Sequence, residues 1–117
     1  MDSITFATLP DCMKEITPQE LKQKLDNKED IQLIDVREEY EHEIVNLSGD
    51  LIPLGIVMES AEKISKDKPV IVYCKTGRRS AVAIMNLENH HGFTNLYNLK
   101  GGIFGYAREV DNSLPTY

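Results

Sequence analysis

Seven consecutive residues in the second half of the chain combine a cysteine with basic side chains and a glycine. They are Cys74, Lys75, Thr76, Gly77, Arg78, Arg79 and Ser80. The run lies between a segment typical of a strand and a segment with helical periodicity, which is where α/β sheets bind ligands. A helix N-terminus presents unpaired N–H groups and a partial positive charge. The run is therefore expected to bind an anion.

Cys74 is the candidate nucleophile of this run. Cysteines at helix N-termini or beside Lys and Arg have pKa values of about 3.5 to 7.5 instead of about 8.5, which favours the thiolate. Gly77 allows the loop to adopt a positive φ. The alternative is a small buried hydrophobic residue beside a solvated basic loop, as most lone cysteines are. The coincidence of strand end, cysteine, glycine, basic cluster and helix start favours the functional interpretation.

The composition limits the class of protein. The chain has 117 residues, with 19 acidic against 13 basic side chains and a formal net charge of -6. Such a charge argues against nucleic acid or an anionic membrane as the main partner. No apolar run reaches the roughly 20 residues of a membrane helix, and the first residues lack the pattern of a secretory signal. We expect one soluble, cytoplasmic domain over residues 1–117, with a core over about 16–117 and an N-terminal extension over 1–15.

Capping residues and hydrophobic periodicity predict the helices and strands that position the cysteine. Thr17, Pro18 and Glu20 form a helix start with a capping box, and this helix is expected to end near Leu25. Strands are expected over 31–36, 70–73 and 95–99, with a short extended piece over 51–54. Helices are expected over about 56–65, from Ser80 to about 91, and over 103–110. The alternation of strands and helices predicts an α/β domain with a parallel sheet.

The sequence resembles the family of rhodanese-type single-domain sulfurtransferases. The pattern Cys-x-x-Gly-x-Arg-Ser of their active-site loop matches residues 74–80, and residues 34–38 resemble their Asp-Val-Arg-Glu motif. Residues 40–53 occupy the place of their Glu-Tyr…Gly-His-Ile…Ile-Pro segment, and 99–103 resemble their Leu-x-Gly-Gly-Ile turn. Residues 40–54 and the ending 109–117 look most like rhodanese domains attached to ubiquitin-activating-like enzymes that load sulfur-carrier proteins.

The resemblance implies a three-layer α/β fold, with a central mostly parallel sheet flanked by helices, and a sulfur-transfer cycle. In this cycle Cys74 would take sulfur from a small anionic donor such as thiosulfate and hold it as a persulfide. A nucleophilic acceptor, such as cyanide, a thiol or a sulfur-carrier protein, would then remove the sulfur. No cofactor is implied, and a monomer is the default expectation.

The resemblance also implies roles for the other residues of the loop. Backbone N–H groups from Lys75 to Ser80, Thr76 and Gly77 included, should converge on the persulfide. Lys75 and Arg78 are suited to attract the anionic donor. Arg79 would either face the anion or pair with a strand-end carboxylate, for which Asp35 is the candidate. Ser80 is expected to cap the helix. Arg37 could contact substrate or form an ion pair within the scaffold, and the scaffold role is preferred.

Two rival functions come from other classes. Some phosphatases and arsenate reductases share the fold, but they have five residues between cysteine and arginine, whereas four separate Cys74 from Arg79. The loop also contains no carboxylate that could act as a general acid. The second rival is a non-catalytic rhodanese-like module that binds partners, and the retained Cys74 with its basic loop argues against it.

The remaining candidates have simpler interpretations. Cys12 could resolve the persulfide, but a free thiol in a terminal segment is the preferred interpretation. The three histidines lack metal-ligand spacing with the cysteines, so no metal is predicted. The acidic residues 38–43 are expected to form a solvated helical turn. Tyr106 stands where the family usually has Trp and is expected at the rim of the site.

Overall fold

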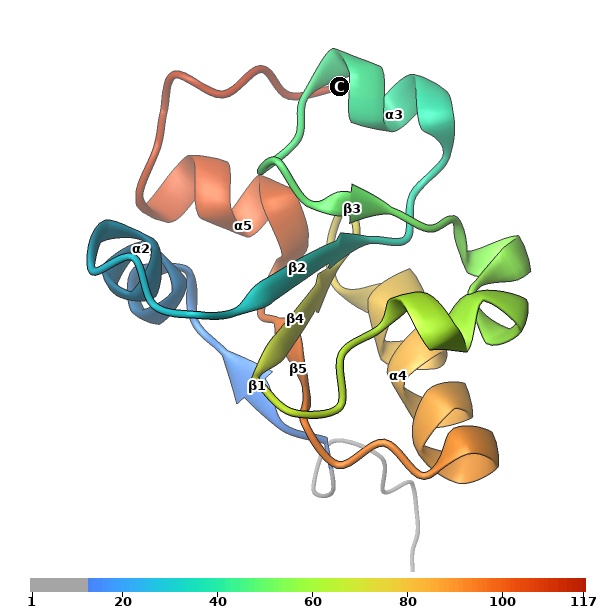
Figure 1. Cartoon of the computed structure of the whole chain (residues 1–117). Helices are drawn as coiled ribbons and strands as arrows, with labels where there is room; N and C mark the ends of the chain where they lie inside the picture. Colours follow the sequence, from blue (N-terminus) through green and yellow to red (C-terminus); the bar gives the residue numbers. More distant parts are fainter. Residues whose placement is uncertain (1–12) are drawn as a thin grey trace, which may run out of the picture.

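A parallel sheet forms the centre of the molecule (Figure 1), in a computed structural model that describes residues 13–117. Its strands are β1 (Glu15–Ile16), β2 (Gln32–Asp35), β3 (Asp50–Leu51), β4 (Val70–Tyr73) and β5 (Leu96–Leu99). They lie in the order β1-β5-β4-β2-β3, and all four pairings are parallel. The expected central sheet is thus confirmed, and it is parallel throughout. The carboxyl ends of its strands lie at one edge, where the loops that follow them can meet.

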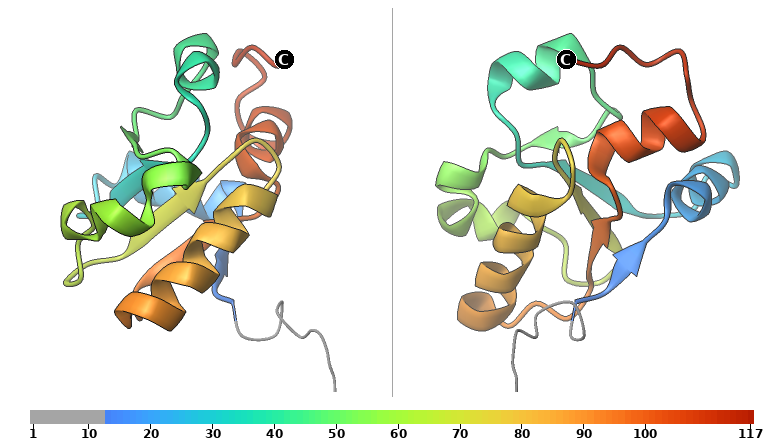
Figure 2. Two further views of the ribbon diagram at one scale, coloured as in Figure 1. Left: turned by 90° about the vertical axis from the view of Figure 1, so that its right-hand side faces the viewer. Right: turned by 180° about the vertical axis from the view of Figure 1, so that it is seen from behind.

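Helices cover both faces of this sheet (Figure 2). They are α2 (Pro18–Asp26), α3 (Glu39–Ile44), α4 (Arg78–His91) and α5 (Gly102–Glu109), with the 3₁₀ segments η1 (Leu54–Ile56) and η2 (Met58–Lys63). Buried residues of α4, together with Val57 and Ile64 on either side of η2, form one apolar cluster with the sheet, and residues of α2 and α5 form a second on the opposite face. This arrangement is the three-layer architecture that the sequence predicted.

The alternation of side chains along β4 decides which layer receives the cysteine. All four residues of this central strand are fully buried. Val70 and Val72 belong to the cluster on the α4 side, whereas Ile71 and Tyr73 belong to the cluster on the α2 and α5 side. Because successive side chains of a strand point to opposite faces, Cys74 continues the series of Val70 and Val72. The cysteine therefore enters the α4 layer, directly before that helix begins.

The first helix begins as its sequence predicted. The Thr17 side chain accepts a hydrogen bond from the Glu20 amide at 3.1 Å, and the Glu20 carboxylate accepts one from the Thr17 amide at 2.9 Å. Pro18 occupies the first helical position, and the helix ends at Asp26, one residue beyond the expected end. No helix within residues 13–117 is long and apolar enough to cross a membrane.

The helix expected over residues 56–65 takes a different form. Two 3₁₀ segments occupy this region, and the second is kinked at Ser60, whose φ of -110° and ψ of 20° are not helical. The Ser60 hydroxyl donates a hydrogen bond to the carbonyl of Ile56 at 2.9 Å. Bonds from Ser side chains to preceding carbonyls compete with the helical ladder, which accounts for the irregular segment.

Candidate active site

The sulfur of Cys74 lies at the carboxyl end of β4 and is almost completely buried, with 1% of the residue exposed. The backbone N–H of Gly77 donates a hydrogen bond to Cys74 Sγ at 3.0 Å. The hydroxyl oxygen of Ser80 lies 3.4 Å from the same sulfur. An N–H donor at this distance can stabilise a negative charge on sulfur, because hydrogen bonds to charged groups are stronger than those to neutral groups. The site can therefore stabilise an anionic sulfur.

The loop reverses direction at Gly77, which has a φ of 103° and directly precedes α4. A residue with a side chain rarely adopts this conformation, so the glycine of the motif has a backbone role. Helix α4 begins at Arg78, two residues before the expected start. Its first amides point toward the loop and bring the positive end of the helix dipole to the sulfur.

Ser80 does not cap α4, and the sequence prediction of a capping role is wrong. The residue lies inside the first turn, because Gly77 is the residue that precedes the helix. The Ser80 side chain is fully buried and donates a hydrogen bond to Asn98 Oδ1 in β5 at 2.6 Å. The hydroxyl group thus points into the sheet beside the cysteine, where it contacts the sulfur instead of the helix end.

Helix α5 holds the first part of the loop from the other side. The N–H groups of Ile103 and Phe104 donate to the carbonyls of Cys74 and Lys75 at 2.9 and 3.1 Å. These donors belong to the first turn of α5 and have no partner within the helix. Gly102 has a φ of 64°, and a Cβ on it would overlap the carbonyl of Lys75. The Gly-Gly turn is therefore required by the close approach of α5 to the loop.

Of the two alternatives for Arg79, facing an anion or pairing with a carboxylate, the structure shows an ion pair, and its partner is Glu41 instead of the candidate Asp35. Arg79 Nη1 and Nη2 donate to Glu41 Oε1 and Oε2 at 2.7 and 2.9 Å. The hydrogen bonds from Arg79 lower the pKa of Glu41 to about 2, against the opposing effect of burial. The expected helical turn over residues 38–43 is present, and Glu39 and Glu43 are exposed, but Glu41 is 3% exposed, so the expectation of solvation is wrong for this residue. Each charge of the pair is balanced by the other, which agrees with the structural role among the two alternatives for Arg79.

Asp35 is engaged by Arg37 instead. Arg37 Nε and Nη2 donate to the two oxygens of Asp35 at 2.9 and 2.8 Å, and His42 Nδ1 lies 2.9 Å from Asp35 Oδ2. Arg37 is fully buried, and burial lowers its pKa, but the bonds to Asp35 and Tyr117 outweigh this and raise the pKa above its ordinary value. This geometry agrees with the scaffold role that the sequence favoured for Arg37.

Tyr117 joins these two ion pairs, although the sequence offered no signal for it. Its hydroxyl accepts from Arg37 Nη1 and donates to Glu41 Oε2, both at 2.7 Å. The Tyr117 ring meets the Phe104 ring edge-on with centroids 5.2 Å apart. A residue 80 positions beyond Arg37 can be matched to it only through the folded structure.

The three remaining loop residues lie at the surface of the site. Lys75 Nζ stands 5.0 Å from the Phe104 ring centroid and 4.9 Å from that of Tyr117, so the ammonium group rests against two aromatic faces. This is a cation–π geometry. Thr76 and Arg78 are exposed. Lys75 and Arg78 thus keep positive charge near the loop, whereas that of Arg79 is paired.

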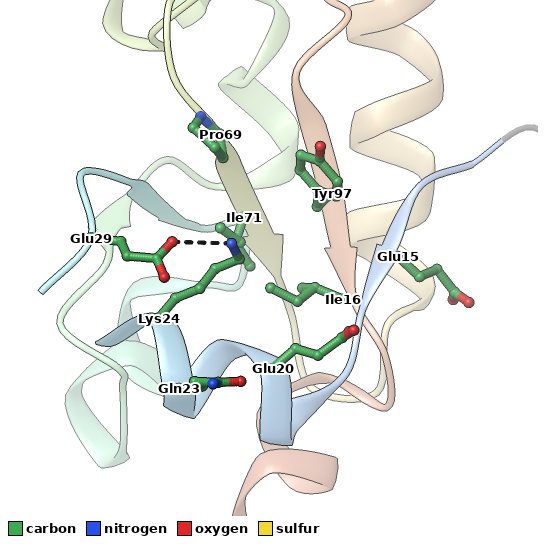
Figure 3. A pocket seen from close by; sticks show the side chains of 9 residues that line it. All are labelled: Glu15, Ile16, Glu20, Gln23, Lys24, Glu29, Pro69, Ile71 and Tyr97. Carbon is green, nitrogen blue, oxygen red and sulfur yellow. Dashed lines mark hydrogen bonds and ion pairs between the residues drawn. The ribbon is translucent and has the colours of Figure 1, made fainter. Parts of the chain in front are cut away.

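Other candidates lie apart from the sulfur. Tyr106 is 7% exposed and packs in the cluster on the α2 and α5 side, so the prediction that it lines the rim is wrong. Tyr97 lines a separate pocket between α2 and the sheet, where Lys24 donates to Glu29 at 3.1 Å (Figure 3). Cys12 lies outside the described residues. Residues 13–117 contain no group of three metal-ligating side chains.

Residues 17–109 of the chain match the family model of the rhodanese-like domain. A probable adenylyltransferase/sulfurtransferase of Mycobacterium tuberculosis, MoeZ, is 37% identical over 105 residues, which cover 87% of this chain and 26% of that protein. A sulfurtransferase of Allochromatium vinosum is 33% identical over 97 residues, covering 82% of this chain and 90% of that protein. The chain thus spans only about a quarter of the length of MoeZ.

Solved structures give the same result. A rhodanese-like domain protein of Staphylococcus aureus superimposes with a TM-score of 0.74 at 29% identity, covering 84% of this chain and 95% of that chain. The relatives also include adenylyltransferase and sulfurtransferase proteins of Drosophila willistoni and of the yeast Vanderwaltozyma polyspora. The resemblance to rhodanese domains attached to sulfur-carrier-activating enzymes is therefore confirmed.

Proposed function

Because the chain belongs to the rhodanese-like domain family, we propose that it is a sulfurtransferase that carries sulfane sulfur as a persulfide on Cys74. The observation that carries this proposal is the hydrogen bond from Gly77 N–H to Cys74 Sγ at the start of α4. Relatives that are named sulfurtransferases support the reaction class. The donor, the acceptor and the persulfide belong to the proposal.

In the first half of the cycle, Cys74 thiolate attacks the outer sulfur of thiosulfate. A new bond forms between Cys74 Sγ and that sulfur, the sulfur–sulfur bond of thiosulfate breaks, and its electron pair leaves with sulfite. The product is the Cys74 persulfide anion, so charge is conserved without an oxidant. The exposed Arg78 and the rim residue Lys75 would attract the dianionic donor to the loop by long-range electrostatics.

In the second half, an acceptor nucleophile attacks the terminal sulfur of the persulfide. The bond between the two sulfurs breaks, the electron pair returns to Cys74 as thiolate, and cyanide as acceptor would leave as thiocyanate. A fixed N–H donor needs no rearrangement as charge moves between the two sulfurs, which favours both steps. A thiol or a sulfur-carrier protein could replace cyanide, and the relatives named adenylyltransferase/sulfurtransferase support a protein acceptor.

The geometry disfavours the phosphatase and arsenate reductase alternative. In that class an arginine must face the anion inside the loop, but both terminal nitrogens of Arg79 bond to Glu41. The carboxylate of Asp35 bonds to Arg37 and contacts His42, so it is poorly placed to supply the proton that a leaving alcohol requires.

Thiocyanate formation from thiosulfate and cyanide tests the proposed function. We expect turnover by the wild type and by Cys12→Ser, and no turnover by Cys74→Ser. Hydrolysis of an aryl phosphate without thiocyanate formation would overturn the proposal and show that the protein is a phosphatase. Equal thiocyanate formation by the wild type and Cys74→Ser would overturn the role of this cysteine. Absence of both thiocyanate formation and phosphate hydrolysis would favour a module that only binds partners.

A further inference from the structure

The side chain of Asn98 contacts the two residues that contact the Cys74 sulfur. Asn98 is 5% exposed and lies in β5. Its Oδ1 accepts the hydrogen bond from Ser80 Oγ at 2.6 Å, and its Nδ2 donates to the carbonyl of Gly77 at 3.1 Å. Ser80 Oγ and Gly77 N lie 3.4 and 3.0 Å from Cys74 Sγ. One amide therefore bonds to both residues that contact the sulfur.

The two bonds of Asn98 also fix the direction of the Ser80 proton. Nδ2 can only donate, so its bond to the Gly77 carbonyl leaves Oδ1 facing Ser80. A hydroxyl has one proton, and Ser80 gives it to Asn98. Ser80 Oγ therefore does not donate to Cys74 Sγ, and the Gly77 N–H is left as the donor to the sulfur. Without Asn98 the hydroxyl would be free to rotate, and the surroundings of the sulfur would not be preorganised.

Asn98 anchors the beginning of α4 as well. The Gly77 carbonyl that accepts from Asn98 also accepts from the Ala81 amide at 3.3 Å, in the first turn of the helix. In the sheet, Asn98 is the register partner of Val72, whose side chain packs on the α4 side. The strand pairing thus brings the amide beneath the start of the helix that faces the sulfur.

We propose that Asn98 is a positioning residue for Cys74 and acts through Ser80 and Gly77. Its contacts are to those two residues, and its role is to hold the hydroxyl and the N–H donor in place. The proposal rests on the proposed function only where sulfur transfer is the readout, since Cys74 reactivity can also be measured by alkylation. Loss of one hydrogen bond between neutral groups changes an equilibrium by up to about tenfold, and Asn98→Leu removes two such bonds, which sets the expected effect.

Asn95 supplies a matched control. It directly precedes β5, and its Nδ2 donates to the carbonyls of Ser65 and Lys68 at 2.8 and 2.7 Å. Asn95→Leu and Asn98→Leu each remove two hydrogen bonds made by an asparagine side chain. The bonds of Asn95 lie at the opposite end of the strand from Cys74, so both variants report on stability but only Asn98→Leu reports on the site.

The experiment measures Cys74 in a Cys12→Ser background, where it is the single thiol. Rate constants are determined for sulfur uptake from thiosulfate in a single turnover and for alkylation by iodoacetamide. We expect Asn98→Leu to lower both by at least about tenfold, and Asn95→Leu to leave both within about twofold of the parent. Equal rates in the two leucine variants would overturn the proposal. If Asn98→Leu does not fold, Asn98→Asp is compared with Asn95→Asp by the same criteria.

A double-mutant cycle tests the route of the effect. Asn98→Leu should cost less in a Ser80→Ala background than alone, because residues that act through each other are not additive. Strict additivity would contradict an action through Ser80. Absence of sulfur uptake in the parent protein would remove the proposed function, and the alkylation rates would still decide the role of Asn98.

Discussion

The guanidinium group of Arg79 binds the carboxylate of Glu41 through two hydrogen bonds of 2.7 and 2.9 Å. This pair joins the first turn of α4, which directly follows the Cys74 loop, to α3. The two residues are 38 positions apart in the sequence. Glu41 is almost fully buried, whereas about a third of the Arg79 side chain is exposed. The arginine of the loop motif thus ties the site to its surroundings.

Loss of the Glu41 carboxylate is expected to destabilise the fold. Glu41→Gln should lower the free energy of unfolding by about 2 kcal/mol, because the partly buried Arg79 loses a charged partner. Urea denaturation measures this change. The control is Glu43→Gln, which alters an exposed carboxylate of the same helix and should cost less than about 0.5 kcal/mol. Equal effects of the two substitutions would contradict the assignment.

The same pair predicts a dependence of stability on pH. Arg79 lowers the pKa of Glu41 to about 2 from an ordinary value of 4.5. A carboxylate whose pKa is lower in the folded state stabilises the fold above pH 4.5, and this stabilisation is lost as the pH falls toward 2. The difference in unfolding free energy between the wild type and Glu41→Gln should therefore shrink between pH 5 and 2. A difference that stays constant over this range would argue against the shift.

Because α5 lies close to the loop, replacement of Gly102 is expected to be unusually destabilising. Gly102→Ala should lower the free energy of unfolding by more than 2 kcal/mol, because it combines a positive φ with overlap of the Lys75 carbonyl. Gly92 also has a positive φ, but a Cβ there would meet no atom within 4 Å. Gly92→Ala should therefore cost only about 1 kcal/mol. Urea denaturation of both variants separates the two effects, and equal costs would exclude the overlap.

The hydroxyl of Tyr117 bonds to one member of each ion pair, so its removal is expected to lower stability. Tyr117→Phe keeps the ring beside Phe104 and Lys75 but removes the bonds to Arg37 and Glu41. We expect a loss of about 1 to 2 kcal/mol in urea denaturation, since both partners are buried and charged. Tyr40→Phe, at a residue that is 64% exposed, should leave the free energy of unfolding nearly unchanged. If Tyr117→Phe left the free energy of unfolding unchanged, the two hydrogen bonds of this hydroxyl would contribute little to stability.

Local signals predicted the fold well because they act over few residues. The capping box of Thr17 and Glu20 defined the start of α2, and the β-branched run 70–73 defined β4. The order of strands and helices then required a parallel sheet with crossover helices. The segment over 54–63 was harder, because competition between Ser60 and the helical ladder is decided by packing.

The sequence predicted only those parts of the site that lie within one continuous segment. The motif from Cys74 to Ser80 identified the loop, its glycine and its position before α4. The partners of that loop could not be read in the same way. Glu41 lies in an acidic run in which nothing distinguishes it from its neighbours, and Asn98 and Tyr117 meet the loop only through strand pairing and the path of the chain after α5.

Intact-mass spectrometry tests the persulfide on Cys74 most directly. The wild type, Cys12→Ser and Cys74→Ser are incubated with thiosulfate under non-reducing conditions, and cyanide is then added. We predict that the wild type and Cys12→Ser each gain the mass of one sulfur atom, that Cys74→Ser gains none, and that cyanide removes the added sulfur. No gain by the wild type, or the same gain by Cys74→Ser, would contradict a persulfide carried on this cysteine.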